Sequence, residues 1–171
     1  MNEDTDWKAD LARYPKRPFL REQSIWAIWA YRSGRRILQW QDGPGKSVAL
    51  KVFWLYYRLV ETLTGITLPI TASIGPGLRI WHFGNVIVHP EAVIGKNCTL
   101  RQGVTIGNRH TDGPPPKIGD NVEFGAYAQV LGGISVGDNC RIGAMSLVLI
   151  DLPPGTTAVG VPAKIIKSEN Q

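Results

Sequence analysis

Hydrophobic side chains recur every six residues over most of the second half of the chain. A period of six matches neither an α-helix, whose apolar positions recur about every 3.6 residues, nor an ordinary strand, whose side chains alternate. It is typical of a parallel β-helix built from hexapeptides, in which each repeat supplies one short strand and one corner. The repeating positions are Ile74, Ile80, Val88, Ile94, Leu100, Ile106, Ile118, Phe124, Val130, Val136, Ile142 and Val148.

Small residues mark the corners and the inner turns of this predicted coil. Seven of the twelve hydrophobic positions are followed directly by glycine, which relieves the backbone where the chain turns sharply. Two residues before the hydrophobic position, the side chain is often small, as at Ala72, Ala92 and Ala128. Cys98 and Cys140 share this position, so we expect reduced core cysteines, with a disulfide or a nucleophile as the alternative.

Two interruptions of the six-residue period hold two of the three histidines. One interval is eight residues long and contains His82. The other spans twelve residues, but its midpoint is Asp112, which cannot fill an apolar core column unpaired. Residues 107–117 are therefore predicted to form a loop outside the coil, and this loop carries His110. Insertions in repeat proteins often build the binding site.

The first third of the chain has a helical pattern instead. Residues 1–20 contain two prolines and mixed charge, which predict a loosely held arm with one helical turn over residues 9–14. Two helices follow, over residues 24–38 and 47–64, separated by a turn at residues 41–45. The second helix is apolar on nearly all sides, so we expect it to be buried between partners or to lie on a membrane surface.

These patterns predict a mainly β protein in three segments. Residues 1–66 form an N-terminal arm and helical segment, residues 67–166 form the β-helix domain, and residues 167–171 form a tail. At 171 residues the chain is long enough for a real core. The polar residues 1–10 predict no signal peptide, and no apolar run approaches the roughly 20 residues of a membrane span. We therefore expect a cytoplasmic protein.

Positive charge and tryptophan are concentrated in the first third. Residues 1–60 carry eleven of the 19 Lys and Arg and six of the 14 Asp and Glu, so they account for the whole net charge of +5. This composition predicts peripheral contact with an anionic surface, such as the inner face of a membrane. The alternative is a solvated charged surface over a tryptophan-rich helical core. No nucleic-acid partner is expected, because no binding motif accompanies the charge.

Three stretches resemble the serine acetyltransferase family: residues 30–32 (AYR), the hexapeptide run, and residues 153–165 (PPGTTAVGVPAKI). Residues 101–109 (RQGVTIGNR) are more similar to relatives that acetylate capsular or exopolysaccharide sugars, of the colanic acid type. The resemblance covers roughly residues 24–167. It implies a left-handed β-helix, a homotrimer with active sites between neighbouring subunits, and acetyl-CoA as the acetyl donor.

His82 matches the catalytic histidine of that family. Moving an acetyl group from a thioester to a hydroxyl needs a base near pH 7, for which imidazole is suited. The CoA thiolate is a good leaving group, so no acyl-enzyme is required. The family also binds CoA along the outside of the coils, where small residues allow close approach of the pantetheine arm. The positions that match are Gly107, Gly125, Ala126, Gly143 and Ala144, with Lys164 as the nearby basic residue.

Three positions depart from the family pattern. Thr67 replaces the acid that normally orients the catalytic histidine, and Glu61 is the nearest acid in sequence that could stand in. Trp81 replaces an aspartate that helps to bind serine, and Pro115 replaces a second active-site histidine. Groups that would hold the ammonium of serine are therefore missing, whereas an aromatic ring can stack on a sugar. These departures predict a sugar or polysaccharide acceptor.

The resulting prediction is an acetyl-CoA-dependent O-acetyltransferase in which Trp81, Arg109 and His110 contact a sugar hydroxyl substrate. The nearest alternative is serine O-acetyltransferase, the same chemistry on another acceptor. A zinc hydratase with three histidine ligands is a second alternative, but His89 precedes a proline at a corner and is expected to be structural, so no metal is expected. The third alternative is an inactive β-helix scaffold that binds a partner.

Overall fold

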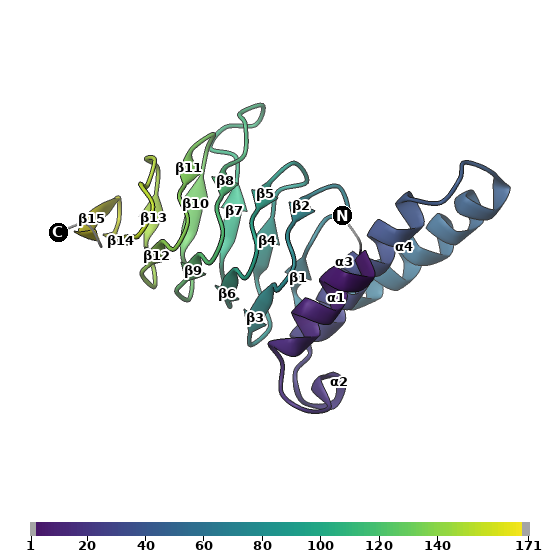
Figure 1. Cartoon of the computed structure of the whole chain (residues 1–171). Helices are drawn as coiled ribbons and strands as arrows, with labels where there is room; N and C mark the ends of the chain where they lie inside the picture. Colours follow the sequence, from purple (N-terminus) through teal and green to yellow (C-terminus); the bar gives the residue numbers. More distant parts are fainter. Residues whose placement is uncertain (1–2, 169–171) are drawn as a thin grey trace.

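The computed structural model describes residues 3–168 as a coil of short strands with helices at its N-terminal end (Figure 1). Residues 1–2 and 169–171, which include most of the predicted tail, lie outside the described residues. The helices are α1 (Glu3–Ala12), α2 (Pro18–Arg21), α3 (Ser24–Leu38) and α4 (Pro44–Thr64). The strands are β1 (Ile66–Thr67), β2 (Ser73–Ile74), β3 (Arg79–Trp81), β4 (Val86–Val88), β5 (Val93–Ile94), β6 (Thr99–Arg101), β7 (Thr105–Gly107), β8 (Lys117–Ile118), β9 (Glu123–Phe124), β10 (Gln129–Leu131), β11 (Ser135–Val136), β12 (Arg141–Ile142), β13 (Leu147–Val148), β14 (Thr156–Gly160) and β15 (Ala163–Ser168).

Consecutive strands lie in three different sheets. The first sheet has the order β1-β4-β7-β10-β13, the second β11-β8-β5-β2, and the third β15-β14-β12-β9-β6-β3. Within residues 3–168 the strand pairs are parallel, apart from β14 with β15 at the C-terminal end. Three consecutive strands therefore make one coil. The predicted parallel β-helix preceded by helices is confirmed.

The interior of the coil is filled by the residues of the six-residue pattern. All twelve hydrophobic positions are buried, and so are the small positions beside them. Cys98 and Cys140 are free and buried, which confirms the expectation of reduced core cysteines. Burial raises the pKa of the Cys98 thiol to about 11, so this thiol is protonated at neutral pH.

Asparagines turn the corners between the second and third sheets. Asn97, Asn121 and Asn139 have positive φ angles of 55°, 57° and 58°, a region that asparagine tolerates better than most residues. Their side chains are also joined from coil to coil. The Asn97 amide donates to the Asn121 oxygen at 3.3 Å, and the Asn121 amide donates to the Asn139 oxygen at 3.1 Å. This ladder fixes the register between coils.

The predicted loosely held arm over residues 1–20 is wrong. α1 packs on α3, and Arg32 of α3 is fully buried beneath it. Arg32 donates from Nε and Nη2 to the Asp10 carboxylate at 2.8 and 3.2 Å, and from Nη1 to the Ile74 carbonyl at 2.9 Å. Burial raises the pKa of Asp10, against the opposing effect of Arg32. The acidic residues that α1 buries are Glu3, Asp6 and Asp10.

Aromatic rings of the first third pack between the helices. The Trp7 ring lies 4.9 Å from Trp29 and 6.0 Å from Phe19, centroid to centroid. Trp7 and Trp29 thus form part of a helical core, as in the alternative interpretation, whereas Trp40 and Trp54 are exposed. Membrane contact stays a prediction. Among the described residues, the helices are too short or too polar to cross a bilayer.

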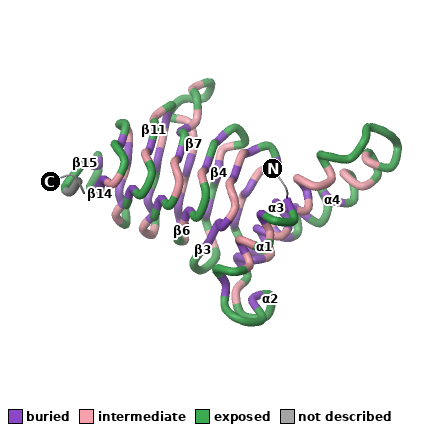
Figure 2. The backbone as a smooth tube through the Cα atoms, viewed as in Figure 1, coloured by how far each residue is buried: buried purple, intermediate pink, exposed green. Residues whose placement is uncertain are grey.

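The two predicted long helices are both present, with one altered boundary. α4 begins at Pro44 rather than Ser47, because proline is favoured in the first helical turn. It ends at Gly65, whose φ of 63° gives a left-handed cap. α3 and α4 form a hairpin that projects beyond the first coil, and much of α4 is exposed (Figure 2).

Candidate active site

His82 lies where the chain leaves the third sheet after β3 and enters the first sheet at β4. In the later coils this corner is turned by one left-handed residue, as at Gly103 (φ 74°) and Tyr127 (φ 59°). The segment before β4 is longer and has three such residues, His82 (φ 67°), Gly84 (φ 100°) and Asn85 (φ 55°). Left-handed non-glycine residues also stand at ordinary corners, as at Tyr127 and Met145. The greater length of the segment, rather than backbone strain, therefore distinguishes the His82 corner from the later ones.

A cavity of about 350 Å³ opens beside this corner. It is bounded on one side by the residues that follow β3 and on the other by the junction of α2 and α3. The residues that line it are Arg21, Glu22, Gln23, Ser24, Trp81, His82 and Phe83. The N-terminal segment is thus part of the candidate site, which the six-residue pattern could not indicate.

Arg79 ties the N-terminal segment to the strand that precedes His82. Its guanidinium lies 3.8 Å from the centroid of the Tyr14 ring and 4.1 Å from that of Trp81. The side chain is only 2% exposed and forms an ion pair with Glu22. The Ser24 hydroxyl donates to the carbonyl of Ile80 at 2.8 Å. These contacts hold Trp81 in place and restrain the backbone immediately before His82.

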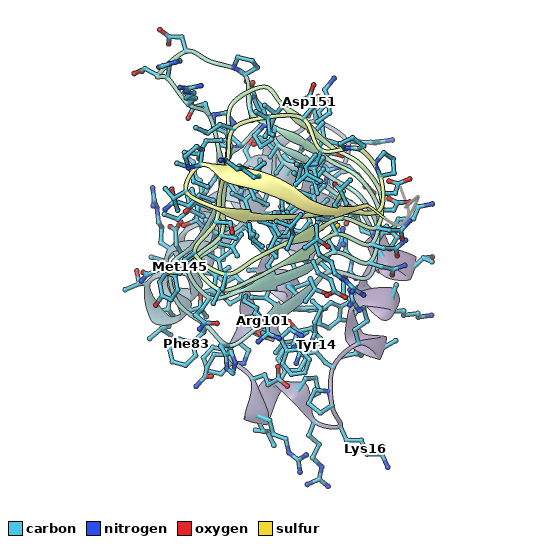
Figure 3. All side chains as sticks on the ribbon, turned by 90° about the vertical axis from the view of Figure 1, so that its left-hand side faces the viewer. Tyr14, Lys16, Phe83, Arg101, Met145 and Asp151 are labelled. Atoms are coloured by element: carbon cyan, nitrogen blue, oxygen red, sulfur yellow. The ribbon has the colours of Figure 1, made fainter. Side chains whose placement is uncertain are left out.

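A second depression, a groove of about 390 Å³, runs along the third sheet. Three arginines, Arg13, Arg101 and Arg141, line it together with small residues at the strand ends and with Glu123, whose carboxylate lies 3.8 Å from Arg141 Nε. Trp81 lines both the groove and the cavity, so the two meet at this ring. Seen along the coil axis, Tyr14, Phe83 and Arg101 lie on one side of the molecule and Asp151 on the other (Figure 3). The predicted donor residues in the groove are Gly125, Gly143 and Ala144.

The other predicted donor residues lie outside this groove. Ala126 follows Gly125 directly, and its carbonyl accepts a hydrogen bond from the Met145 amide at 2.8 Å. Gly107 ends β7 in the first sheet, and Lys164 lies in β15 at the C-terminal end. Within one chain, the predicted set is therefore divided between two sheets.

Glu61 lies near the His82 segment but does not bond to it. The Thr67 hydroxyl donates to Glu61 Oε1 at 2.7 Å, and Arg58 donates to Oε2 at 2.9 Å. The end of α4 touches the longer corner, because the Val86 amide donates to the Gly65 carbonyl at 3.1 Å. No hydrogen bond joins Glu61 to His82 among residues 3–168. Thr67, which replaces the acid of the family pattern, is thus hydrogen-bonded to another acid, Glu61.

The loop that carries Arg109 and His110 lies at a different corner. It connects β7 in the first sheet to β8 in the second, whereas His82 connects the third sheet to the first. Both loop residues line a separate hollow of about 210 Å³ with Pro114 and Leu131. The structure therefore does not bring these residues to His82 within one chain.

His89 has the structural role expected of it. Its Nδ1 accepts a hydrogen bond from the Glu91 amide at 3.1 Å, two residues further along the chain. In the described part of the chain, no group of three or more His, Cys, Asp and Glu side chains is arranged to hold a metal ion.

Five arginines at the site, Arg13, Arg21, Arg79, Arg101 and Arg141, were not among the sequence predictions. Arg101 and Arg141 each stand next to a hydrophobic position of the third sheet, and neighbouring strand residues point to opposite faces. The six-residue register could therefore have placed both outside the coil. Arg79 holds the same register position as Arg141, directly before a hydrophobic position, but the N-terminal segment buries it. No comparable signal points to Arg13 or Arg21, because they belong to that segment, which has no repeat.

The comparisons place the chain among hexapeptide-repeat acetyltransferases. Residues 115–149 match the bacterial transferase hexapeptide (six repeats) family. A serine acetyltransferase of Helicobacter pylori strain J99 is 43% identical over 119 residues, which cover 66% of this chain and 67% of that protein. The chain spans between 53% and 67% of the length of the curated relatives that it matches.

Solved structures show the same likeness over nearly the whole chain. The serine acetyltransferase of Neisseria gonorrhoeae, in complex with serine, matches with a TM-score of 0.78 and 32% identity, covering 96% of this chain and 67% of that one. A serine acetyltransferase in complex with CoA matches with a TM-score of 0.78 and 29% identity, covering 96% of this chain and 68% of that one.

Proposed function

Because this chain belongs to the serine acetyltransferase family of hexapeptide-repeat acyltransferases, we propose that it transfers the acetyl group of acetyl-CoA to the hydroxyl group of serine. The observation that carries the proposal is the meeting of two sites at Trp81. This ring borders both the cavity that His82 lines and the groove that three arginines line. Group transfer requires two substrates to be held with their reacting atoms in contact.

The predicted sugar or polysaccharide acceptor is contradicted by the comparisons, and so is the closer likeness to capsular polysaccharide acetyltransferases. The relatives that match at 36–43% identity are serine acetyltransferases, which favours the alternative acceptor. The prediction gave too much weight to Trp81 and Pro115, where two groups of the family pattern are missing. Such a loss removes two contacts, but other side chains of the same cavity can replace them.

Arg21 is the candidate that binds the other charged group of serine, its carboxylate. Its side chain is exposed at the cavity that His82 lines, and it makes no hydrogen bond or ion pair with another residue of the described chain. A guanidinium binds a carboxylate through two parallel N–H donors. Trp81 forms the apolar wall of the same cavity.

His82 acts as the general base in this proposal. Its imidazole takes the proton of the serine hydroxyl while the oxygen forms a bond to the carbonyl carbon of the thioester. The carbon–sulfur bond then breaks, and His82 returns the proton to the departing sulfur. Glu61, which accepts a hydrogen bond from the Thr67 hydroxyl, is proposed as the acid that orients the imidazole.

The groove on the third sheet is the proposed path of the donor. Gly125, Gly143 and Ala144, with Ala126 next to them, let the pantetheine arm approach the backbone. Arg101 and Arg141 carry the positive charge that the phosphates of CoA require. The small residues and the cations thus fit an anionic donor along the outside of the coils.

The remaining predicted residues are proposed to act across a subunit boundary. Gly107, Arg109 and His110 belong to a corner that one chain keeps away from His82. In a homotrimer with active sites between neighbouring subunits, as the resemblance implies, this corner of one subunit faces the His82 corner of the next. Lys164 is proposed to contact the far end of the donor.

The test is release of free thiol from acetyl-CoA with serine and with free and nucleotide-linked sugars as acceptors. We expect turnover with serine and none with the sugars. Turnover with sugars alone would overturn the serine assignment. Serine amide, which lacks the carboxylate, provides the matched substrate for Arg21. Arg21→Gln should raise the KM for serine roughly tenfold, as expected for a lost charged contact, and leave the KM for serine amide unchanged.

A further inference from the structure

Gln102 lies in the second coil, opposite the point at which the His82 segment leaves the first. β3 and β6 pair in parallel with Trp81 opposite Arg101, so His82 and Gln102 follow neighbouring strand ends. The backbones of neighbouring strands are about 4.8 Å apart. The side chain of Gln102 therefore begins close to any substrate group that His82 contacts.

The two ends of the Gln102 amide have different surroundings. Its oxygen, Oε1, is buried and has no hydrogen-bond partner among residues 3–168. Its nitrogen, Nε2, makes no hydrogen bond to those residues either, but it is not buried. A buried polar atom without a partner destabilises a fold, so the stability of the coil does not explain this side chain. The accessible end of the amide carries two N–H donors.

The position of Gln102 is special to its coil. In the third and fourth coils the same position is occupied by Ala126 and Ala144. A side chain with a hydrogen-bond donor thus occurs here in the coil next to His82 and not in the two coils that follow. The backbone of Gln102 is also fixed, because its carbonyl accepts a hydrogen bond from the Tyr127 amide at 2.8 Å. The fold therefore presents the donor from a rigid corner.

The proposed acetyl transfer needs a hydrogen-bond donor beside the base. When the serine oxygen bonds to the thioester carbon, the electron pair of the carbonyl bond moves to the carbonyl oxygen, and it returns when the carbon–sulfur bond breaks. Donors held about 3 Å from that oxyanion stabilise the transition state. The backbone amides of Gly103 and Tyr127 are already engaged, because they donate to the Gly84 and Gln102 carbonyls at 3.1 and 2.8 Å. The Gln102 amide, in contrast, is free to donate.

We propose that Gln102 donates a hydrogen bond from Nε2 to the oxyanion that forms on the acetyl group. The groove proposed for the donor leads to this place, because Trp81 and Arg101 line it and stand directly before His82 and Gln102. A thioester that follows the groove meets the base at one strand end and the amide at the next. The inference rests on the proposed acetyl transfer but does not depend on serine as the acceptor, because the oxyanion forms on the thioester.

Gln102→Met tests this role, because it removes the donor and keeps a side chain of similar length. Loss of one oxyanion donor lowers kcat by about 10²- to 10³-fold, so we expect that decrease in serine-dependent thiol release, with unchanged KM values for serine and acetyl-CoA. The midpoint of urea denaturation should not fall, because the variant also removes the unpaired buried oxygen. Gln102→Glu, which keeps the shape but has no N–H donor, should lose at least as much activity. Gln41→Met, in the exposed turn between α3 and α4, is the matched control and should keep full activity.

Two results with Gln102→Met would overturn the proposal. The first is an unchanged kcat, whether or not the KM for acetyl-CoA rises, because the amide would then make no contact that is specific to the transition state. The second is a shifted pH dependence of kcat/KM, which would mean that Gln102 positions His82, because an oxyanion donor acts only in the transition state. The unmodified protein is measured first. If it released no thiol with any acceptor, the proposed acetyl transfer would fail and this inference with it, whereas turnover with another acceptor would overturn the serine assignment alone.

Discussion

In the coils from β4 to β13, the buried side chains are nearly all aliphatic or small, whereas in the segment from α1 to β3 the largest fully buried side chains are two arginines. The coils repeat the same columns of hydrophobic residues, so each coil resembles the next. The N-terminal segment has no repeat, and it is joined to the first coil by Arg32 and Arg79, with their carboxylate partners.

The repeating coils stabilise the fold, whereas the non-repeating segment defines the position of the candidate active site. A column of aliphatic side chains stabilises a coil without distinguishing one coil from another, so it cannot make one corner special. The buried arginines contact particular strands, and Arg79 stands immediately beside the corner that carries His82. The candidate active site therefore lies where the non-repeating segment docks on the first coil.

The largest effect should come from the buried charge of the N-terminal segment. Arg32→Met leaves Asp10 and Asp6 without their cation and Glu3 with Arg35 alone, and loss of one partner of a buried ion pair costs about 3–5 kcal/mol. We expect a decrease of that size in the free energy of unfolding, measured by urea denaturation. Lys46→Ala removes the cation of an exposed pair with Asp42 and is the control, with an unchanged midpoint. Equal stability of the two variants would show that the segment is held by its aromatic rings alone.

The next effect is on catalysis and should come from Arg79. Arg79→Met removes the cation between the Tyr14 and Trp81 rings, and a small shift of His82 is expected to lower kcat by roughly ten- to a hundredfold. Arg141→Met, further along the groove, should instead raise the KM for acetyl-CoA and leave kcat unchanged. Steady-state kinetics with both substrates separates the two outcomes. A change in KM alone for Arg79→Met would mean that this residue binds substrate rather than positioning the base.

The smallest effect is expected in the coil itself. The raised pKa of Cys98, about 11 because the thiol is buried, leaves it uncharged at pH 8, and the thiolate is the reactive form. Iodoacetamide should therefore fail to modify Cys98 in the folded protein and should modify it after unfolding in urea. Mass spectrometry of the peptide that contains it gives the result. Rapid modification of the folded protein would indicate that this coil opens readily.

The fold could be predicted from sequence because its buried hydrophobic residues recur at a constant spacing. All twelve positions of the six-residue pattern are buried, and the two long helices lie where their apolar spacing put them. α1 was missed for the opposite reason. Its acidic residues resemble a solvated surface, and only the buried Arg32 on another helix reveals that they face inward. The sequence pattern of α1 alone does not show that Arg32 lies opposite its acidic residues.

The site could be predicted only in part. His82 was proposed because it interrupts the period and matches the catalytic histidine of the family, and Gly125, Gly143 and Ala144 because they match the family's donor positions; these roles stay predictions. The contacts of Arg21 and Arg79 arise between α2, α3 and β3, and a spacing along the chain does not contain them. The acceptor was misjudged because the missing family residues are visible in the sequence, whereas the other side chains of the cavity are brought together only by the fold.

The most direct test of the central claim is the rate of serine-dependent thiol release from acetyl-CoA by the unmodified protein and by His82→Ala. A general base contributes about 10²- to 10⁴-fold, so we expect kcat to fall by that factor while the circular dichroism spectrum and the oligomeric mass stay the same. An unchanged kcat in a correctly folded His82→Ala protein would contradict the assignment of His82 as the base.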